Sequence, residues 1–223
     1  MSLNSFISTS RKIMRGDAGV DGDAQRIAQL TWLLFLKVYD AKEADWEFHN
    51  PAYQSIIPKH LRWRSWAPDR KDGRSKTGEE LLTFLNTELF PVLKSLPISA
   101  STPLSQSVVR AVFEDSNQYM KDGILIRQLV NLIDEIDFED YTERHAFGEI
   151  YETLLKELQS AGSSGEYYTP RAVTDFMIEM INPRLGETVA DFAAGTAGFL
   201  TSTLKHLNEQ VESVEDREAY RSS

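Results

Sequence analysis

Residues 162–171 read GSSGEYYTPR, a permissive loop that runs directly into a helix start. Thr169 is expected to cap the helix, and Pro170 fits its first turn because the missing N–H has no partner to lose there. The apolar spacing then predicts a helix that ends at Asn182-Pro183. Such a helix start presents free N–H groups and the positive end of the helix dipole, which suit a carboxylate or a phosphate.

A second stretch, DFAAGTAGFL at residues 191–200, predicts a strand, a turn and a helix. Residues 188–192 are expected to form a short buried strand that leads into a glycine turn. The glycines fall as D-x-x-x-G-x-x-G, which differs from the G-x-G-x-x-G fingerprint of dinucleotide-binding folds. Small residues at a strand end still let a ligand approach the backbone, although a tight turn without a ligand fits the same pattern.

The chain before these two stretches predicts helices only. Residues 23–43 carry apolar side chains on all faces behind Asp23, the expected N-cap, so this helix should be buried scaffold. Residues 78–96 predict an amphipathic helix that Pro91 is expected to kink. Helical patterns return in QSVVRAVF, ILIRQLVNLIDEI and ERHAFGEIYETLLKELQ, and no convincing strand pattern occurs before residue 185.

Length and composition allow one large domain or two modest ones in these 223 residues. We expect a mainly α fold, with an all-helical domain over residues 1–160 and the beginning of an α/β domain over residues 161–223. There is no cysteine, so disulfides and thiolate zinc sites are excluded, and the four histidines are too scattered to predict a metal site. The longest apolar run covers residues 30–36, and the N-terminus lacks a signal-peptide pattern, which favours a cytoplasmic protein without a membrane span.

Charge is distributed unevenly along the chain. Residues 1–110 carry 15 basic and 12 acidic side chains, whereas residues 111–223 carry 9 and 22. Basic residues gather around two tryptophans in residues 59–76, a composition that suits a phosphate backbone but equally a solvated loop anchored by its tryptophans. The candidate DNA-binding residues are Arg62, Arg64, Arg70, Lys71 and Arg74.

Taken together, the two glycine-containing stretches resemble a known family. GEYYTPRAVTDFM resembles motif X, and DFAAGTAGFL resembles motif I, of the modification (methyltransferase) subunit of type I restriction–modification systems. The segments DAGVDGDAQRIAQLTWLLFLKVYD and FGEIYETLLKEL are similar to that family's N-terminal helical domain. The resemblance covers essentially the whole chain and implies that the α/β part is Rossmann-like.

The resemblance implies a pocket for S-adenosylmethionine between the two motifs. Asp191 would bind the methionine ammonium, and Thr169 with the neighbouring N–H groups would bind the carboxylate. Motif I commonly has glycine where Ala197 stands, and the alanine methyl is tolerable only if the backbone there does not need a positive φ. The implied cofactor-binding residues are Glu166, Tyr167, Tyr168, Thr169, Pro170, Arg171, Asp191, Gly195, Thr196, Ala197 and Gly198.

The resemblance also implies a catalytic N-P-P-F motif, which does not occur in this sequence. No catalytic residue is therefore assigned. The predicted strand 188–192 has no convincing neighbour in the chain, and a lone strand leaves unpaired backbone groups. We expect the chain to be the N-terminal part of a longer protein, to transfer no methyl group by itself, and to bind the cofactor weakly or not at all.

The implied function is site-specific methylation of adenine N6 in double-stranded DNA. The implied partners are a specificity subunit and a restriction subunit. Two alternatives remain open: a Rossmann-like methyltransferase with a substrate other than DNA, and a non-enzymatic helical docking module.

Overall fold

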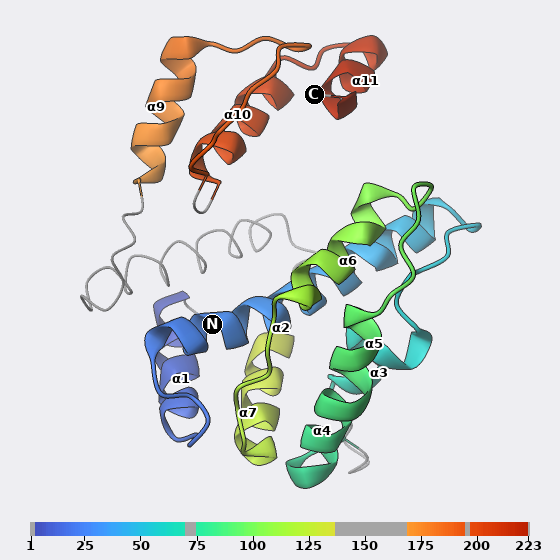
Figure 1. Cartoon of the computed structure of the whole chain (residues 1–223), viewed down its shortest axis with the longest axis vertical. Helices are drawn as coiled ribbons and strands as arrows, with labels where there is room; N and C mark the ends of the chain where they lie inside the picture. Colours follow the sequence, from blue (N-terminus) through green and yellow to red (C-terminus); the bar gives the residue numbers. More distant parts are fainter. Residues whose placement is uncertain (1–2, 70–74, 137–168, 195–196, 223) are drawn as a thin grey trace. The chain divides into compact units, whose positions relative to one another are not determined.

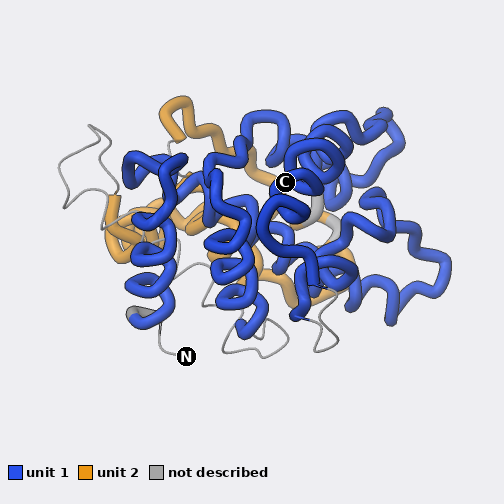
Figure 2. The backbone as a smooth tube through the Cα atoms, turned by 90° about the horizontal axis from the view of Figure 1, so that it is seen from below, with its two compact units in different colours: residues 1–158 blue, residues 159–223 orange. Residues whose placement is uncertain are grey.

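The computed structural model describes residues 3–69, 75–136, 169–194 and 197–222. The chain divides into two compact units, residues 1–158 and residues 159–223 (Figure 2). The predicted domain boundary at residue 160 lies outside the described residues.

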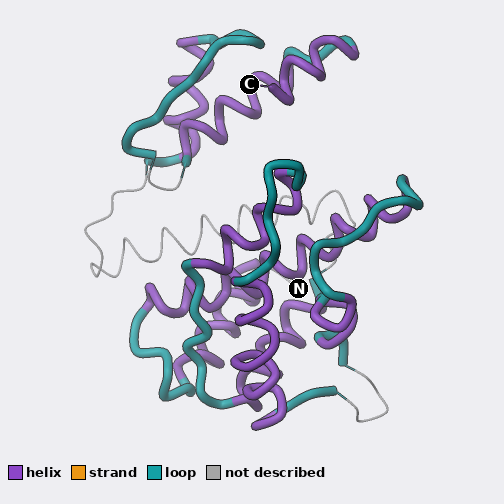
Figure 3. The backbone as a smooth tube through the Cα atoms, turned by 45° about the vertical axis from the view of Figure 1, so that its right-hand side comes forward, coloured by secondary structure: helices purple, strands orange, loops and turns teal. Residues whose placement is uncertain are grey.

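The described part of the first unit consists of helices joined by loops, with no strand (Figure 3). The predicted all-helical character is confirmed for these residues, while the helix predicted in ERHAFGEIYETLLKELQ lies outside the described part. None of the described helices combines the length and the apolar character that a membrane crossing requires. The elements are α1 (Leu3–Arg15), α2 (Asp23–His49), the 3₁₀ turn η1 (Lys59–Leu61), α3 (Trp63–Trp66), α4 (Gly78–Phe84), the π turn η2 (Leu85–Leu89), α5 (Phe90–Lys94), α6 (Leu104–Glu114) and α7 (Gly123–Asp134).

Helix α2 carries much of the core of the first unit, as predicted (Figure 1). Trp32 is fully buried, and its ring meets Phe90 edge-on at 5.1 Å between centroids and Phe113 at 6.3 Å. These contacts tie α2 to α5 and α6. Helix α7 in turn packs against α1, α2 and α4, so α2 and α7 together hold the unit around one apolar core.

The predicted N-cap of α2 is wrong by one residue. Gly22 is the N-cap and makes no side-chain cap, while Asp23 is the first helical residue. The Asp23 carboxylate instead accepts from Arg26 at 2.7 Å and Arg11 at 3.3 Å. A carboxylate is attracted more strongly by two guanidinium groups than by a backbone N–H, which explains why Asp23 pairs with the arginines and does not cap the helix.

The helix predicted over residues 78–96 is continuous but contains one widened turn, the π turn η2. The Phe90 N–H donates to the Leu85 carbonyl, five residues back. Pro91 follows immediately, and a proline inside an α-helix both lacks a donor and clashes with the carbonyl four residues earlier. The widened turn is one of the recognised ways in which a helix accommodates such a break.

Glu43 of α2 is a buried acid whose side chain has no exposed area. The Tyr53 hydroxyl donates a 2.9 Å hydrogen bond to its Oε1, and Arg62 Nε lies 4.0 Å from its Oε2. Burial removes the carboxylate from water and raises the pKa of Glu43 above its ordinary value, although hydrogen bonds from Ser55 and Tyr53 and the charge of Arg62 act in the opposite direction.

The Glu43 carboxyl makes the stability of this unit depend on pH. Between the ordinary value of 4.5 and the raised pKa, the folded protein binds a proton that the unfolded chain has released. The unfolding free energy should therefore fall as pH rises through this window, and Glu43→Gln should remove that part of the fall. Urea midpoints measured between about pH 4 and pH 8 would test this. Glu114→Gln, at an exposed position, is the matched control; parallel curves for the parent and Glu43→Gln would contradict the assignment.

Candidate functional site

The second unit is built on two adjacent helices, α9 (Arg171–Ile181) and α10 (Gly198–Glu209), followed by α11 (Val214–Ser222). The first residues of α9 and α10 meet, because Arg171 Nη1 donates to the Gly198 carbonyl at 3.1 Å. At their other ends, Asn182 Oδ1 lies 3.0 Å from Nε2 of His206 in the last turn of α10, and Gln210 Nε2 donates to the Pro183 carbonyl. The two helices therefore run side by side in the same direction (Figure 1).

Polar side chains fill the middle of the contact between α9 and α10. Thr174 and Ser202 are buried, and their hydroxyl oxygens lie 2.9 Å apart. Ser202 also donates to the Asp175 carboxylate at 2.6 Å, and Lys205 lies 3.5 Å from the other carboxylate oxygen. Buried hydroxyls need such partners, so this network fixes the register of the two helices. These residues were not predicted from the sequence, since serine and threonine within a helix pattern carry no signal of their own.

The parallel arrangement has an electrostatic consequence. Each helix carries roughly half a positive charge at its N-terminus from unpaired N–H groups. In α9 and α10 these ends are adjacent, as the contact between Arg171 and Gly198 shows. A negatively charged group placed between them would be attracted by both dipoles.

The start of α9 differs from the prediction by one or two residues. Pro170 occupies the N-cap position, and its carbonyl accepts from Val173 N–H at 2.9 Å and Thr174 N–H at 3.2 Å. Thr169 lies outside the helix and is exposed, and the end carries no side-chain cap, so its predicted capping role is wrong. The predicted end is confirmed: α9 stops at Ile181, and Asn182 adopts the left-handed conformation with φ 53°.

The buried strand predicted over residues 188–192 is also wrong. These residues form no strand; Val189 is 43% exposed and Phe192 is 99% exposed. A parallel strand needs a neighbouring strand to satisfy its backbone groups, and the described part of the chain offers none. The segment therefore lies as an extended loop between the two helices.

Asp191 and Ala197 lie at the two ends of the turn that precedes α10. Asp191 is half-buried, and its Oδ1 accepts from the Ala193 N–H at 3.0 Å, which leaves the second oxygen as an acceptor. Ala197 is the N-cap of α10 with φ 57° and ψ 32°. The condition under which the methyl is tolerable, a backbone without a positive φ, is therefore not met, and the alanine is held in a conformation that glycine adopts without strain.

Of the predicted cofactor residues, the structure brings together the described members of the two motifs at Arg171 and Gly198. Thr169, Pro170, Asp191 and Ala197 adjoin these two helix starts in the sequence. The remaining predicted residues lie outside the described part of the chain: Glu166, Tyr167, Tyr168, Gly195 and Thr196.

Two of the predicted DNA-binding residues in the first unit are held by carboxylates of α2. Arg62 donates to Glu47 at 2.6 Å. Arg64 bridges Asp40 at 2.8 Å and the second oxygen of Glu47 at 2.7 Å. These pairs hold the segment around α3 against α2 and neutralise both arginines. Arg70, Lys71 and Arg74 lie outside the described residues.

The two tryptophans of the basic segment belong to the core. Trp63 is 1% exposed and donates its Nε1–H to Asp134 at 2.7 Å, and Trp66 is 5% exposed. Buried rings cannot stack on nucleic-acid bases, so the anchoring role is confirmed for both tryptophans.

Two known protein families match the chain, one over its N-terminal part and the other over its C-terminal part. Residues 3–133 match the family described as HsdM N-terminal domain. Residues 142–221 match the family described as N-6 DNA Methylase.

Individual relatives give the same result. The chain is 49% identical over 217 residues to the EcoEI type I restriction enzyme methylase subunit of Escherichia coli, which covers 97% of this chain and 44% of that protein. It is similar to the crystal structure of a modification subunit from Vibrio vulnificus, with a TM-score of 0.84, 38% identity, and 98% of this chain and 48% of that chain covered. A chain from a structure on complex assembly and conformational transition of the type I R-M system gives a TM-score of 0.75 at 32% identity, with 98% of this chain and 43% of that chain covered. The chain spans less than half the length of each of these relatives.

The left-handed backbone at Ala197 predicts a stabilising substitution. Ala197→Gly should stabilise the start of α10 by about 1 kcal/mol, because glycine tolerates a positive φ that alanine resists. This corresponds to about fivefold slower hydrogen exchange of the α10 amides if they exchange through local opening. Ala194→Gly is the matched control, since Ala194 has no positive φ and glycine there should give no gain. Equal effects of the two substitutions would contradict the assignment of strain to Ala197.

Proposed function

The chain belongs to the family of type I restriction enzyme methylase subunits, and we propose that it serves in methylation of adenine N6 in double-stranded DNA as part of a modification subunit. The observation that carries this proposal is the meeting of the two helix starts, α9 and α10, through Arg171 and Gly198. Two helix starts that are 27 residues apart in the sequence thereby come together.

The site suits the amino-acid end of S-adenosylmethionine. That end carries a carboxylate and an ammonium group, and the two adjacent helix dipoles attract the carboxylate. The half-buried Asp191 carboxylate precedes the turn that leads into α10, and it offers an acceptor to the ammonium. When bound, this cofactor supplies an electrophilic methyl group. The cofactor-contacting residues of this proposal are Glu166, Tyr167, Tyr168, Thr169, Pro170, Arg171, Asp191, Gly195, Thr196, Ala197 and Gly198.

We further propose that the second unit is the start of a Rossmann-like α/β layer. Two parallel helices joined by an extended segment have the connectivity of such a layer, in which both helices cover the same face of a sheet. Helix α9 also exposes a stripe of apolar side chains at helical spacing, and burying them against a sheet would remove them from water. The exposed members are Val173, Phe176, Met177, Met180 and Ile181.

The chemistry of transfer needs residues that these 223 do not supply. No N-P-P-F sequence is present to hold the target amino group, so we propose that this chain alone transfers no methyl group to DNA. The proposed partners of the whole protein are double-stranded DNA, a specificity subunit and a restriction subunit.

In the first unit we propose that residues of the basic segment contact the DNA backbone. Arg62 and Arg64 are already paired with Glu47 and Asp40, so their part is to hold the segment on α2. Direct phosphate contact then falls to the other cations of the segment, among them Arg70, Lys71 and Arg74.

The cofactor site can be tested on the chain as it stands. At millimolar S-adenosylmethionine, NMR amide shifts should concentrate on the first turns of α9 and α10, and Asp191→Asn should weaken the response several-fold because the ammonium loses its charged acceptor. Glu209→Gln, at an exposed position in the last turn of α10, should leave the response unchanged.

Two results would contradict this proposal. Shifts confined to other parts of the chain at about 10 mM cofactor would exclude the site. Incorporation of labelled methyl groups into DNA by this chain alone would contradict the statement that it lacks the transfer machinery.

A further inference from the structure

The contact between α9 and α10 keeps one alignment along its whole length. Arg171 bonds to the carbonyl of Gly198, 27 residues later in the sequence. In the middle of the contact, Ser202 meets Asp175 across 27 residues and Thr174 across 28. At the far ends of the two helices the interval is again 27 residues. The helices therefore lie level, with their starts at the same height.

Apolar packing contributes little to this alignment. The buried side chains of α9 are Thr174 and Ile178, and those of α10 are Ser202, Thr203 and Leu207. Three of these five carry a hydroxyl group, which leaves one buried apolar side chain on each helix. Two apolar side chains bury a similar area in several registers, whereas a hydrogen bond forms only at the right distance and angle. The hydroxyl groups therefore decide the register.

The Ser202 hydroxyl is the group on which the register depends, because both of its hydrogen bonds cross to α9. It donates to Asp175 at 2.6 Å and lies 2.9 Å from the Thr174 hydroxyl. Thr174 has a second partner in its own helix, the Arg171 carbonyl at 2.9 Å. Asp175 is partly exposed and pairs with Lys205 at 3.5 Å, a weak contact through a long side chain. Removal of the Ser202 hydroxyl therefore leaves neither partner on α9 buried without a contact.

A shift of the helices by one turn shows what the Ser202 hydroxyl prevents. About four residues make one turn, so the shift would place Ser202 opposite Ile178, whose side chain offers no hydrogen bond. A hydroxyl buried without a partner is disfavoured. The same shift would move one helix start past the other by about 5.4 Å and separate Arg171 from Gly198.

We propose that Ser202 is a positioning residue for the cofactor site. It does not touch the cofactor. Its hydroxyl selects the register in which the starts of α9 and α10 lie level, so that one carboxylate is attracted by both helix dipoles. In any other register the carboxylate meets one helix start only. This inference rests on the proposed function and gives a part in binding to a residue outside the proposed cofactor contacts.

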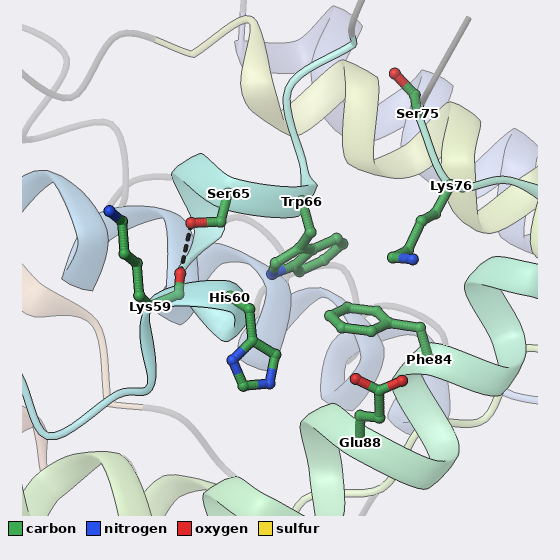
Figure 4. A pocket seen from close by; sticks show the side chains of 8 residues that line it. All are labelled: Lys59, His60, Ser65, Trp66, Ser75, Lys76, Phe84 and Glu88. Atoms are coloured by element: carbon green, nitrogen blue, oxygen red, sulfur yellow. Dashed lines mark hydrogen bonds between the residues drawn. The ribbon is translucent and has the colours of Figure 1, made fainter.

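A surface hollow of the first unit provides an internal reference for the test (Figure 4). It has a volume of about 660 Å³, and its lining includes His60. Figure 4 shows the Lys59 ammonium turned away from the hollow, while Lys76 is paired with Glu80 at 2.9 Å. Glu88 adds a negative charge to the lining. The hollow therefore does not gather positive charge around an anion, and the His60 signals should not respond to the cofactor.

The test is the amide response of the full chain to millimolar S-adenosylmethionine. Ser202→Ala should weaken the apparent affinity about three- to tenfold, because the register that binds becomes a smaller fraction of the population. Thr203→Val is the matched control. It also removes a buried hydroxyl from α10, but one that donates to the Phe199 carbonyl of the same helix at 2.9 Å, so the response should be unchanged.

Two further measurements separate positioning from a merely structural role. A Cβ on Gly198 would lie 3.5 Å from Thr174 Cγ2, so a nuclear Overhauser contact between the Thr174 methyl and the Gly198 α-protons reports the register without cofactor. Ser202→Ala should weaken this contact several-fold. Hydrogen exchange of amides in the middle of α9 and α10 should stay within about twofold of the parent rate, since alanine favours the helix.

Three results would overturn the proposal. They are an unchanged Thr174–Gly198 contact in Ser202→Ala, equal losses of cofactor response in Ser202→Ala and Thr203→Val, and faster exchange throughout both helices in Ser202→Ala. Failure of the cofactor site gives a different pattern: a response confined to other parts of the parent chain, or absent, with the Thr174–Gly198 contact still weakened in Ser202→Ala. That pattern would reject the part of Ser202 in cofactor binding and retain its effect on the register.

Discussion

The parallel contact of α9 and α10 is the constraint on which the candidate cofactor site depends. Parallel neighbours place like ends of two dipoles together, an arrangement that is electrostatically unfavourable without compensation. Thr174, Ser202 and Asp175 hold the helices in this register through buried hydrogen bonds. A carboxylate placed between the two positive helix ends would relieve their mutual repulsion. The same repulsion that disfavours the parallel arrangement would therefore favour binding of the carboxylate.

In the first unit, several charged side chains are paired with one another within the fold and so do not contribute to the charge of the surface. The three acids Asp40, Glu43 and Glu47 lie on one face of α2 and share the two arginines Arg62 and Arg64. Burial at Glu43 favours its protonated form, which brings the group closer to neutrality. Net charge along the sequence therefore says little about the surface, because the fold has already engaged Arg62 and Arg64 of the basic segment.

The sequence predicted the helices well and the site only partly. Helical periodicity identified α2, α7 and the end of α9, since Leu33 and its neighbours repeat at the spacing of a buried helix and Asn182-Pro183 stops one. It failed for residues 188–192, because β-propensity is realised only with a neighbouring strand. It also gave no sign that Arg62 and Arg64 are paired, because their partners lie on α2, 15 or more residues earlier, and no local pattern marks such pairs.

The π turn in residues 85–89 has a consequence for how this segment can vary in length. An extra residue in one turn rotates everything after it by about 100° about the helix axis. Leu81 before the turn, Leu85 within it, and Phe90 and Leu93 after it all reach the same core. Loss of a single residue here would turn Phe90 away from Trp32, so related chains should keep the number of residues between α4 and α5 even where they change the residues themselves.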